Sequence, residues 1–148
     1  MQNTKDRFYP VIIVGGGPCG IAAGAELKKK GIESVILEKG SVTESIRKYP
    51  KRMRFFSTAE NIEIAGIPFA TSNVKANRNE ALQYYRKVAA YFDLQFKLNT
   101  EVRSVSKQNG HFEVETSKGK FHSDKVVLAT GYFDVPRMLG VDGEKSEH

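Results

Sequence analysis

The residues best suited to chemistry lie near the start of the chain, in a six-residue turn that contains four glycines. Gly15, Gly17 and Gly20 have the G-x-G-x-x-G spacing of a dinucleotide-binding turn. We expect the first to reverse the chain from a strand into a helix, the second to let the backbone approach a pyrophosphate, and the third to let the helix lie close to the strand. Pro18 suits the first helical position, and the N–H groups of this helix end would face the phosphates.

An acidic residue follows at the distance that this motif requires. Glu38 lies 18 residues after Gly20, at the end of a predicted strand. A carboxylate at this place accepts hydrogen bonds from a ribose 2′-hydroxyl and repels a 2′-phosphate, which argues against NADP in this particular site. We expect Lys39, the next residue, to contribute to the same cofactor-binding site.

The glycine turn needs a strand before it and a helix after it, and the sequence supplies both. Residues 8–14 are an apolar run with several β-branched side chains, typical of a buried parallel strand. Helical spacing of apolar residues covers 18–30, and Gly31 suits the helix end. Residues 34–37 form a second buried strand. The pattern is that of a βαβ unit.

The remaining elements complete an α/β domain. After an irregular stretch from Gly40 to Asn77 we expect a helix over residues 80–92, capped by Asn77 or Asn79. Alternating segments at 102–106, 112–116 and 120–122, joined by Asn-Gly and Lys-Gly turns, precede a buried strand at 125–128. The sequence therefore predicts a Rossmann-type domain with a parallel central sheet, helices packed on it and a small antiparallel β-meander insertion.

Composition narrows the class of protein. The chain has 148 residues, 40% hydrophobic and 27% charged, which suits one soluble globular domain. No apolar run is long enough to span a bilayer, and no secretory signal is visible, so we expect a cytoplasmic protein without a membrane partner. The net charge of +6 is not accompanied by a nucleic-acid-binding motif. The three histidines have no partners at ligand spacing, so no metal site is expected.

The single cysteine has two interpretations. Cys19 falls at the second position of the predicted helix, beside the glycine turn. A helix N-terminus lowers the pKa of a thiol and raises its thiolate fraction, which favours a redox role. Alternatively, Cys19 is a small packing residue. An intrachain disulfide is excluded, because no second cysteine is present.

The order of the later elements distinguishes FAD from NAD. A simple NAD domain continues with further βα units, whereas this chain inserts the meander before a strand that ends in Ala129-Thr130-Gly131. That order resembles the FAD domain of the thioredoxin-reductase and glutathione-reductase superfamily. The resemblance implies that VVLATG at 126–131 returns the chain to the flavin, and that backbone groups of Val102 meet the adenine.

One branch of that superfamily resembles the chain more closely. The stretches GGGPCGIAAG at 15–24, RFFSTAENIEIAGIPF at 54–69, RNEALQYYRKVA at 78–89 and VVLATGYFDVP at 126–136 are similar to single-cysteine flavoproteins proposed as bacillithiol disulfide reductases. Family members are about twice as long and carry a second glycine fingerprint for NADPH. We therefore expect residues 1–148 to be an incomplete FAD-binding domain, inactive alone, with NADPH bound only by the full-length protein.

The resemblance also implies a mechanism and a site. NADPH would supply electrons through FAD, with Cys19 acting on a small-molecule disulfide that a single thiol can attack but cannot resolve alone. The stretch Phe55–Thr58 would lie near the isoalloxazine, although simple core packing of its two phenylalanines is an equal alternative. Arg47, Arg52 and Arg54 could meet phosphates or an anionic substrate, or form a solvated face. Tyr84 and Tyr85 are expected to pack the helix.

Two rival functions stay open. The first is a dinucleotide-binding module without turnover. The second is the FAD domain of another two-domain flavoprotein, a flavin monooxygenase or a ferredoxin–NADP reductase. Cys19 in the glycine turn favours the reductase over the monooxygenase. The sequence leaves open whether the protein forms a homo-oligomer.

Overall fold

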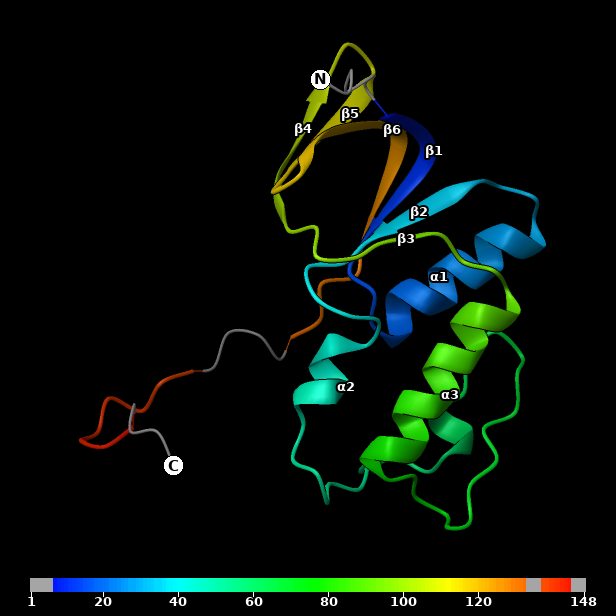
Figure 1. The fold of residues 1–148 in the computed structure, drawn as a ribbon, viewed down its shortest axis with the longest axis vertical. Coiled ribbons are helices and arrows are strands. Elements are labelled where there is room, and N and C mark those ends of the chain that lie inside the picture. The colour runs from blue at the N-terminus through cyan, green and yellow to red at the C-terminus, as the bar shows by residue number, and fades with distance from the viewer. Residues whose placement is uncertain (1–6, 133–136, 145–148) are drawn as a thin grey trace.

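A six-stranded β-sheet forms the centre of the molecule (Figure 1). The computed structural model describes residues 7–132 and 137–144, and within them the strands follow the order β3-β2-β1-β6-β5-β4. The strands are β1 Arg7–Val14, β2 Ser34–Leu37, β3 Phe96–Lys97, β4 Val102–Gln108, β5 His111–Thr116 and β6 Gly119–Leu128. Strands β3, β2, β1 and β6 are parallel, whereas β5 and β4 are antiparallel to their neighbours. The predicted α/β class, with a parallel centre and a meander, is confirmed.

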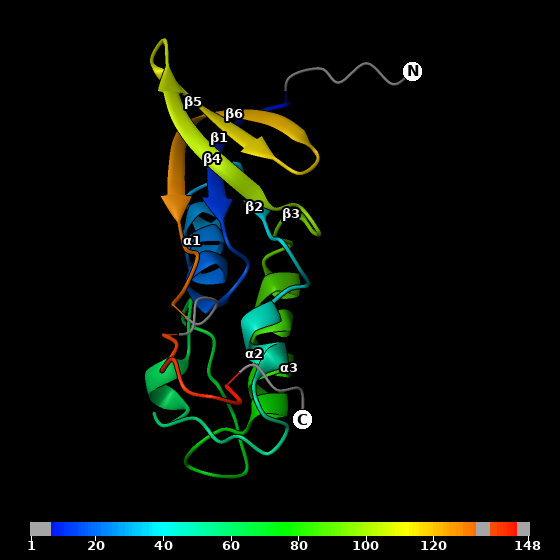
Figure 2. The same cartoon turned by 90° about the vertical axis from the view of Figure 1, so that its left-hand side faces the viewer.

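Strand β1 lies in the middle and is covered on both faces. Val11 and Ile13 pack on the side of the sheet that carries α1, whereas Ile12 and Val14 pack against Val114 of β5. The meander therefore curves over the face that α1 leaves uncovered, and in Figure 2 β4 crosses in front of β1. Burial on both faces explains why the second half of this strand, from Val11 to Val14, is continuously apolar.

The helices pack below the sheet in Figure 1. They are α1 Pro18–Lys29, α2 Glu44–Lys48, the 3₁₀ helix Glu60–Ile62 and α3 Arg78–Tyr91. Of the two predicted caps for α3, the structure uses Asn77: its side chain accepts the N–H of Glu80, and the Glu80 carboxylate accepts the N–H of Asn77. Within the described residues, no helix has the length and apolarity needed to cross a membrane.

Two tyrosines of α3 hold part of the irregular stretch that precedes it. The Tyr84 hydroxyl donates to the carbonyl of Ile67 at 2.6 Å, and the Tyr85 hydroxyl donates to that of Ile62 at 2.8 Å. The ring of Phe69 stacks on Tyr84 with centroids 4.1 Å apart. Burial raises the pKa of the Tyr85 hydroxyl above its ordinary value. The predicted packing role of both tyrosines is confirmed.

Several elements differ from the sequence prediction. The expected separate strands at 120–122 and 125–128 are one strand, β6, because it pairs with β5 over its first half and with β1 from residue 121 onward. Strand β3 and helix α2 were not predicted, since two and five residues are too few to show a period. The end of the stretch 126–136 and His148 lie outside the described residues.

Candidate dinucleotide-binding site

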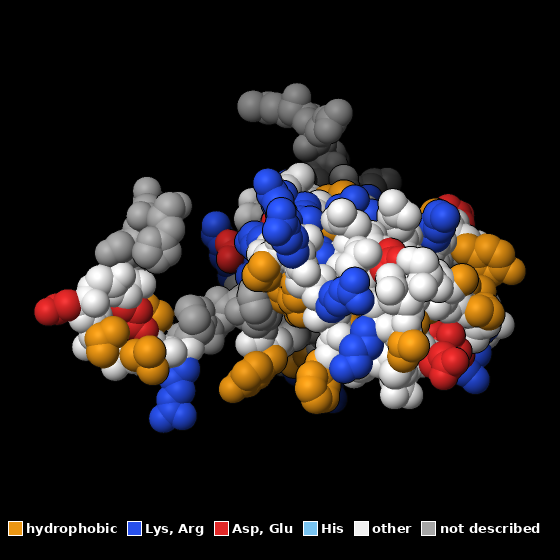
Figure 3. Space-filling view, turned by 90° about the horizontal axis from the view of Figure 1, so that it is seen from below, with side chains coloured by type: hydrophobic (Ala, Val, Ile, Leu, Met, Phe, Trp, Pro, Cys, Tyr) orange, Lys and Arg blue, Asp and Glu red, His pale blue; other side chains and the backbone are white. Residues whose placement is uncertain are grey.

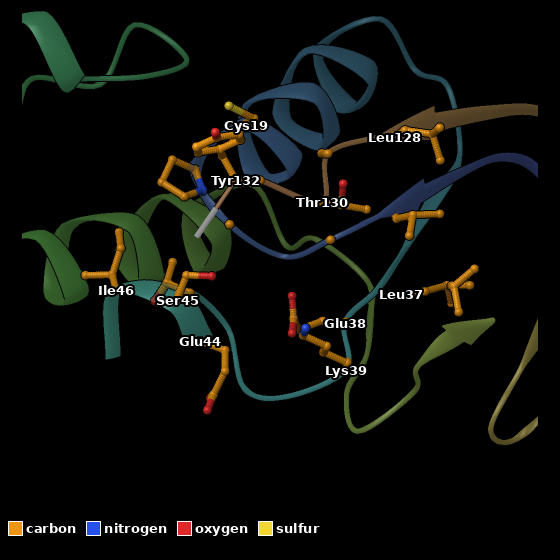
Figure 4. A pocket seen from close by; sticks show the side chains of 18 of the residues that line it. Cys19, Leu37, Glu38, Lys39, Glu44, Ser45, Ile46, Leu128, Thr130 and Tyr132 are labelled. Atoms are coloured by element: carbon orange, nitrogen blue, oxygen red, sulfur yellow. The ribbon is translucent and has the colours of Figure 1, made fainter. Parts of the chain in front are cut away.

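A pocket of about 780 Å³ opens where β1, β2 and β6 end (Figure 4). Parallel α/β sheets place ligands at this edge, beyond the carboxyl ends of the strands. All the predicted cofactor-binding residues except Gly20 line it: Gly15, Gly17, Pro18, Cys19, Glu38, Lys39, Val102, Ala129, Thr130 and Gly131. The structure thus brings together residues from four separate parts of the sequence.

Two glycines of the motif are required by close backbone contacts. Gly15 has φ +108°, and a Cβ there would lie 2.3 Å from the carbonyl oxygen of Ala129. A Cβ on Gly20 would lie 2.0 Å from the carbonyl oxygen of Gly15, but 3.5 Å from Ile13 of β1. The predicted reason for Gly20 therefore needs correction. A side chain at this position would clash first with the backbone of the glycine turn and not with strand β1. Gly20 is not among the residues that line the pocket.

Gly17 stands at the open side of the turn, at the N-cap of α1, and Pro18 occupies the first turn as predicted. A Cβ on Gly17 would have no neighbour within 4 Å, so the space before the helix N-terminus is unobstructed. Helix N–H groups facing such a space form an anion-binding site. This arrangement fits a pyrophosphate.

Glu38 is fixed between the glycine turn and the next loop. Its side chain is only 7% exposed, yet it lines the pocket, and Figure 4 shows its carboxylate directed inward. Its Oε2 accepts the N–H of Gly16 at 2.6 Å, and its Oε1 accepts the N–H of Gly40 at 2.7 Å. Since each carboxylate oxygen has a second lone pair, the group can still accept bonds from ribose hydroxyls.

The ends of β6 and β4 complete the wall. The Ala129 N–H donates to the carbonyl of Val14 at 2.8 Å, which continues the pairing of β6 with β1 past the last strand residue. Thr130 and Gly131 then turn along the pocket, and Val102 closes it from the start of β4. These positions are compatible with the predicted contacts to flavin and adenine.

Cys19 is the second residue of α1, and its side chain is exposed. It lines the pocket at the end away from Leu37 in Figure 4, on the same side as Tyr132. The thiol belongs to none of the hydrophobic core clusters of the described residues, which speaks against a packing role within this core. A redox role stays a prediction.

The sequence analysis missed the wall contributed by α2 and the loop before it. Thr43, Glu44, Ser45 and Ile46 all line the pocket. The Glu44 carboxylate accepts bonds from the Ser41 hydroxyl and the Arg47 guanidinium, and these partners hold its pKa far below the ordinary value, the guanidinium most strongly. The one sequence signal for this helix was the spacing of Glu44 and Arg47, an acidic residue three positions before a basic one, which is typical of an ion pair on a helix.

The two phenylalanines of the FFST stretch have different environments. Phe55 is half-buried, packs against the core cluster around α3 and lines the pocket. Phe56 is 92% exposed, and the Lys75 ammonium lies 5.0 Å from the centre of its ring. Core packing is therefore wrong for Phe56.

The basic side chains are spread over the surface. Figure 3 shows more Lys and Arg than Asp and Glu on the end of the molecule away from the sheet. Arg47, Arg52 and Arg54 are exposed and do not line the pocket. Their positions agree with a solvated face. His111 contacts Asp124 at 2.8 Å, and the described residues contain no cluster suited to a metal ion.

Together the sheet order, the glycine turn and Glu38 define a Rossmann-type nucleotide-binding domain with a meander beside its parallel strands. The chain belongs to the pyridine nucleotide-disulphide oxidoreductase family, whose model matches residues 12–148.

Individual relatives agree with this assignment. The chain is 44% identical over 134 residues to bacilliredoxin reductase from Bacillus subtilis, covering 90% of this chain but 41% of the relative. A bacillithiol disulfide reductase structure from Staphylococcus aureus matches with a TM-score of 0.89 and 39% identity, over 95% of this chain and 43% of that one. A flavin-containing monooxygenase from Stenotrophomonas maltophilia matches with a TM-score of 0.78 and 26% identity, over 84% and 39%. The chain thus spans less than half the length of these relatives.

Proposed function

We propose that the chain is the FAD-binding part of an NADPH-dependent flavoprotein oxidoreductase that reduces a low-molecular-weight thiol disulfide. The observation that carries the proposal is one pocket lined by the glycine turn, Glu38 and an exposed Cys19. The relatives named as bacilliredoxin and bacillithiol disulfide reductases support the substrate class. On this proposal residues 1–148 form an incomplete FAD domain, and NADPH binds elsewhere in a longer polypeptide.

Different residues of the pocket would bind different parts of FAD. The open turn at Gly17 and the N-terminus of α1 would hold the pyrophosphate, and Glu38 the adenosine ribose. Val102 would contact the adenine, and the segment from Ala129 to Gly131 the flavin end. FAD supplies a two-electron carrier between NADPH and a disulfide.

Cys19 would act as the nucleophile. Its thiolate attacks one sulfur of the disulfide, a new S–S bond forms, and the other sulfur leaves as a thiolate. A two-electron reductant, NADPH acting through FAD, would then cleave the mixed disulfide, which would return Cys19 to its thiolate and release the second sulfur as a thiolate that takes up a proton. Because the external reductant replaces the second thiol that would otherwise resolve the mixed disulfide, one cysteine would be sufficient.

The cofactor assignment is tested by titrating FAD into the purified chain and following quenching of flavin fluorescence. Glu38→Gln removes the negative charge and presents an amide to backbone donors, so we expect FAD affinity to fall by about tenfold or more. Glu60→Gln, an exposed residue of the 3₁₀ helix, serves as the control. Equal affinity of both variants, or no saturable binding by the wild type, contradicts the assignment.

The role of Cys19 is tested in a longer polypeptide that contains this sequence together with an NADPH-binding domain. Cys19→Ala should abolish NADPH-dependent disulfide reduction while FAD stays bound, as read from the visible spectrum. Disulfide turnover by the substituted protein would refute the nucleophile. NADPH oxidation that yields an oxygenated product would instead favour the monooxygenase alternative, which the match to a flavin-containing monooxygenase supports.

A further inference from the structure

We infer that Thr43 is a positioning residue for the pyrophosphate turn, and that it acts through Gly16 rather than by its side chain touching the nucleotide. The inference rests on the proposed cofactor site. Thr43 lies in the loop before α2, and its side chain is fully buried although the residue borders the pocket. Its sequence position carries no recognisable signal.

Gly16 is the position between the first two motif glycines, where the motif allows any residue type. Both its N–H and its carbonyl make hydrogen bonds to other parts of the chain. Its carbonyl accepts the N–H of Thr43 at 3.0 Å, and its N–H donates to Oε2 of Glu38 at 2.6 Å. Oε1 of Glu38 accepts the N–H of Gly40 at 2.7 Å, three residues before Thr43. These bonds form a closed ring that joins the turn, the carboxylate and the loop.

Thr43 occupies a conformation that its residue type rarely adopts. Its backbone is left-handed, with φ 60° and ψ 40°. For a β-branched residue this conformation is strained, and such strain persists only where surrounding contacts hold it. Those contacts are present: the carbonyl of Thr43 accepts the N–H of Arg47 to begin α2, and its hydroxyl donates to the carbonyl of Val42 at 2.6 Å.

The ring of hydrogen bonds allows little relative movement of the glycine turn, the Glu38 carboxylate and the loop before α2. A Cβ on Gly16 would lie 3.1 Å from three atoms of the Glu38 side chain, so the turn and the carboxylate are already in close contact. Fixing Gly16 therefore fixes the spacing between the pyrophosphate turn and the ribose-binding carboxylate. Because both anchors are ordered before the ligand arrives, less conformational entropy is lost on binding.

The test compares two substitutions at one position. Thr43→Gly keeps the N–H and adopts φ 60° without strain, whereas Thr43→Pro removes the N–H and cannot adopt that angle. We expect FAD affinity to fall by about threefold or less in the glycine variant and by about tenfold or more in the proline variant. Hydrogen exchange of the Gly16 amide, measured in the cofactor-free chain, should be slow in the wild type and the glycine variant and at least about tenfold faster in the proline variant.

The two proposals fail in different ways. If the wild type binds no FAD but its Gly16 amide is protected and Thr43→Pro exposes it, the cofactor proposal fails and the positional role stands. If the wild type binds FAD and a folded proline variant binds it equally well, Thr43 has no positioning role. Should the proline variant not fold, the scalar coupling across the hydrogen bond from Thr43 to Gly16 in wild-type NMR spectra decides, and its absence overturns the inference.

Discussion

Gly17 and Gly20 are the same residue type in one motif, yet the structure gives them different reasons to be glycine. Gly20 faces the carbonyl oxygen of Gly15, where no side chain fits. Gly17 faces open space at the mouth of α1, so only a ligand would meet a side chain there. Gly20 is therefore required for folding, and Gly17 is required for ligand binding.

This difference predicts opposite phenotypes for two alanine substitutions. Gly20→Ala should destabilise the fold by about 1–3 kcal/mol, because the methyl group forces the turn apart. Gly17→Ala should change the free energy of unfolding by less than about 0.5 kcal/mol but weaken FAD binding by about tenfold. Urea unfolding and FAD titration of both variants separate the effects. Equal destabilisation by both would refute the distinction.

Among the elements, α3 anchors the irregular stretch before it through hydrogen bonds from its two tyrosines. The stability of this helix depends on its N-terminal cap. Asn77→Ala removes the side-chain oxygen that accepts two helix N–H groups, so we expect a loss of about 1 kcal/mol of stability. Asn79→Ala, within the first turn and exposed, is the matched control and should be nearly neutral. Thermal unfolding monitored by circular dichroism provides the measurement. A cap without effect would show that packing of the two tyrosines alone fixes the helix start.

Helix α2 is stabilised at its start by an ion pair that responds to pH. The Arg47 guanidinium and the Ser41 hydroxyl hold the pKa of Glu44 below its ordinary value of 4.5. A carboxyl whose pKa is lower in the folded state contributes stability above the unfolded pKa and loses it as the pH falls. We therefore expect the wild type to lose more thermal stability below about pH 4.5 than Glu44→Gln does. Parallel acid profiles of the two proteins would refute this.

At the scale of the whole molecule, sequence reasoning succeeded where structure is local. The glycine spacing, the apolar run before it and Glu38 predicted the first βαβ unit and the part of the pocket that it lines, because each signal lies within one short segment. The contributions of β4 and β6 were implied only by the family resemblance, and the wall from α2 was not predicted. The union of two predicted strands into β6 depends on pairing with β1, more than 100 residues earlier. The left-handed Thr43 likewise depends on contacts across the fold, and no local pattern announces it.

The place of β6 beside β1 has a consequence for biosynthesis. Strand β6 leaves the ribosome more than 100 residues after β1, so one edge of β1 stays unpaired while all the intervening elements are synthesised. Until residue 128 has emerged, the nascent chain has no partner for Val14 on that side and no Ala129 behind the glycine turn. Contacts between strands so distant in sequence form slowly, so we expect protection of this unit to arise late and in one step.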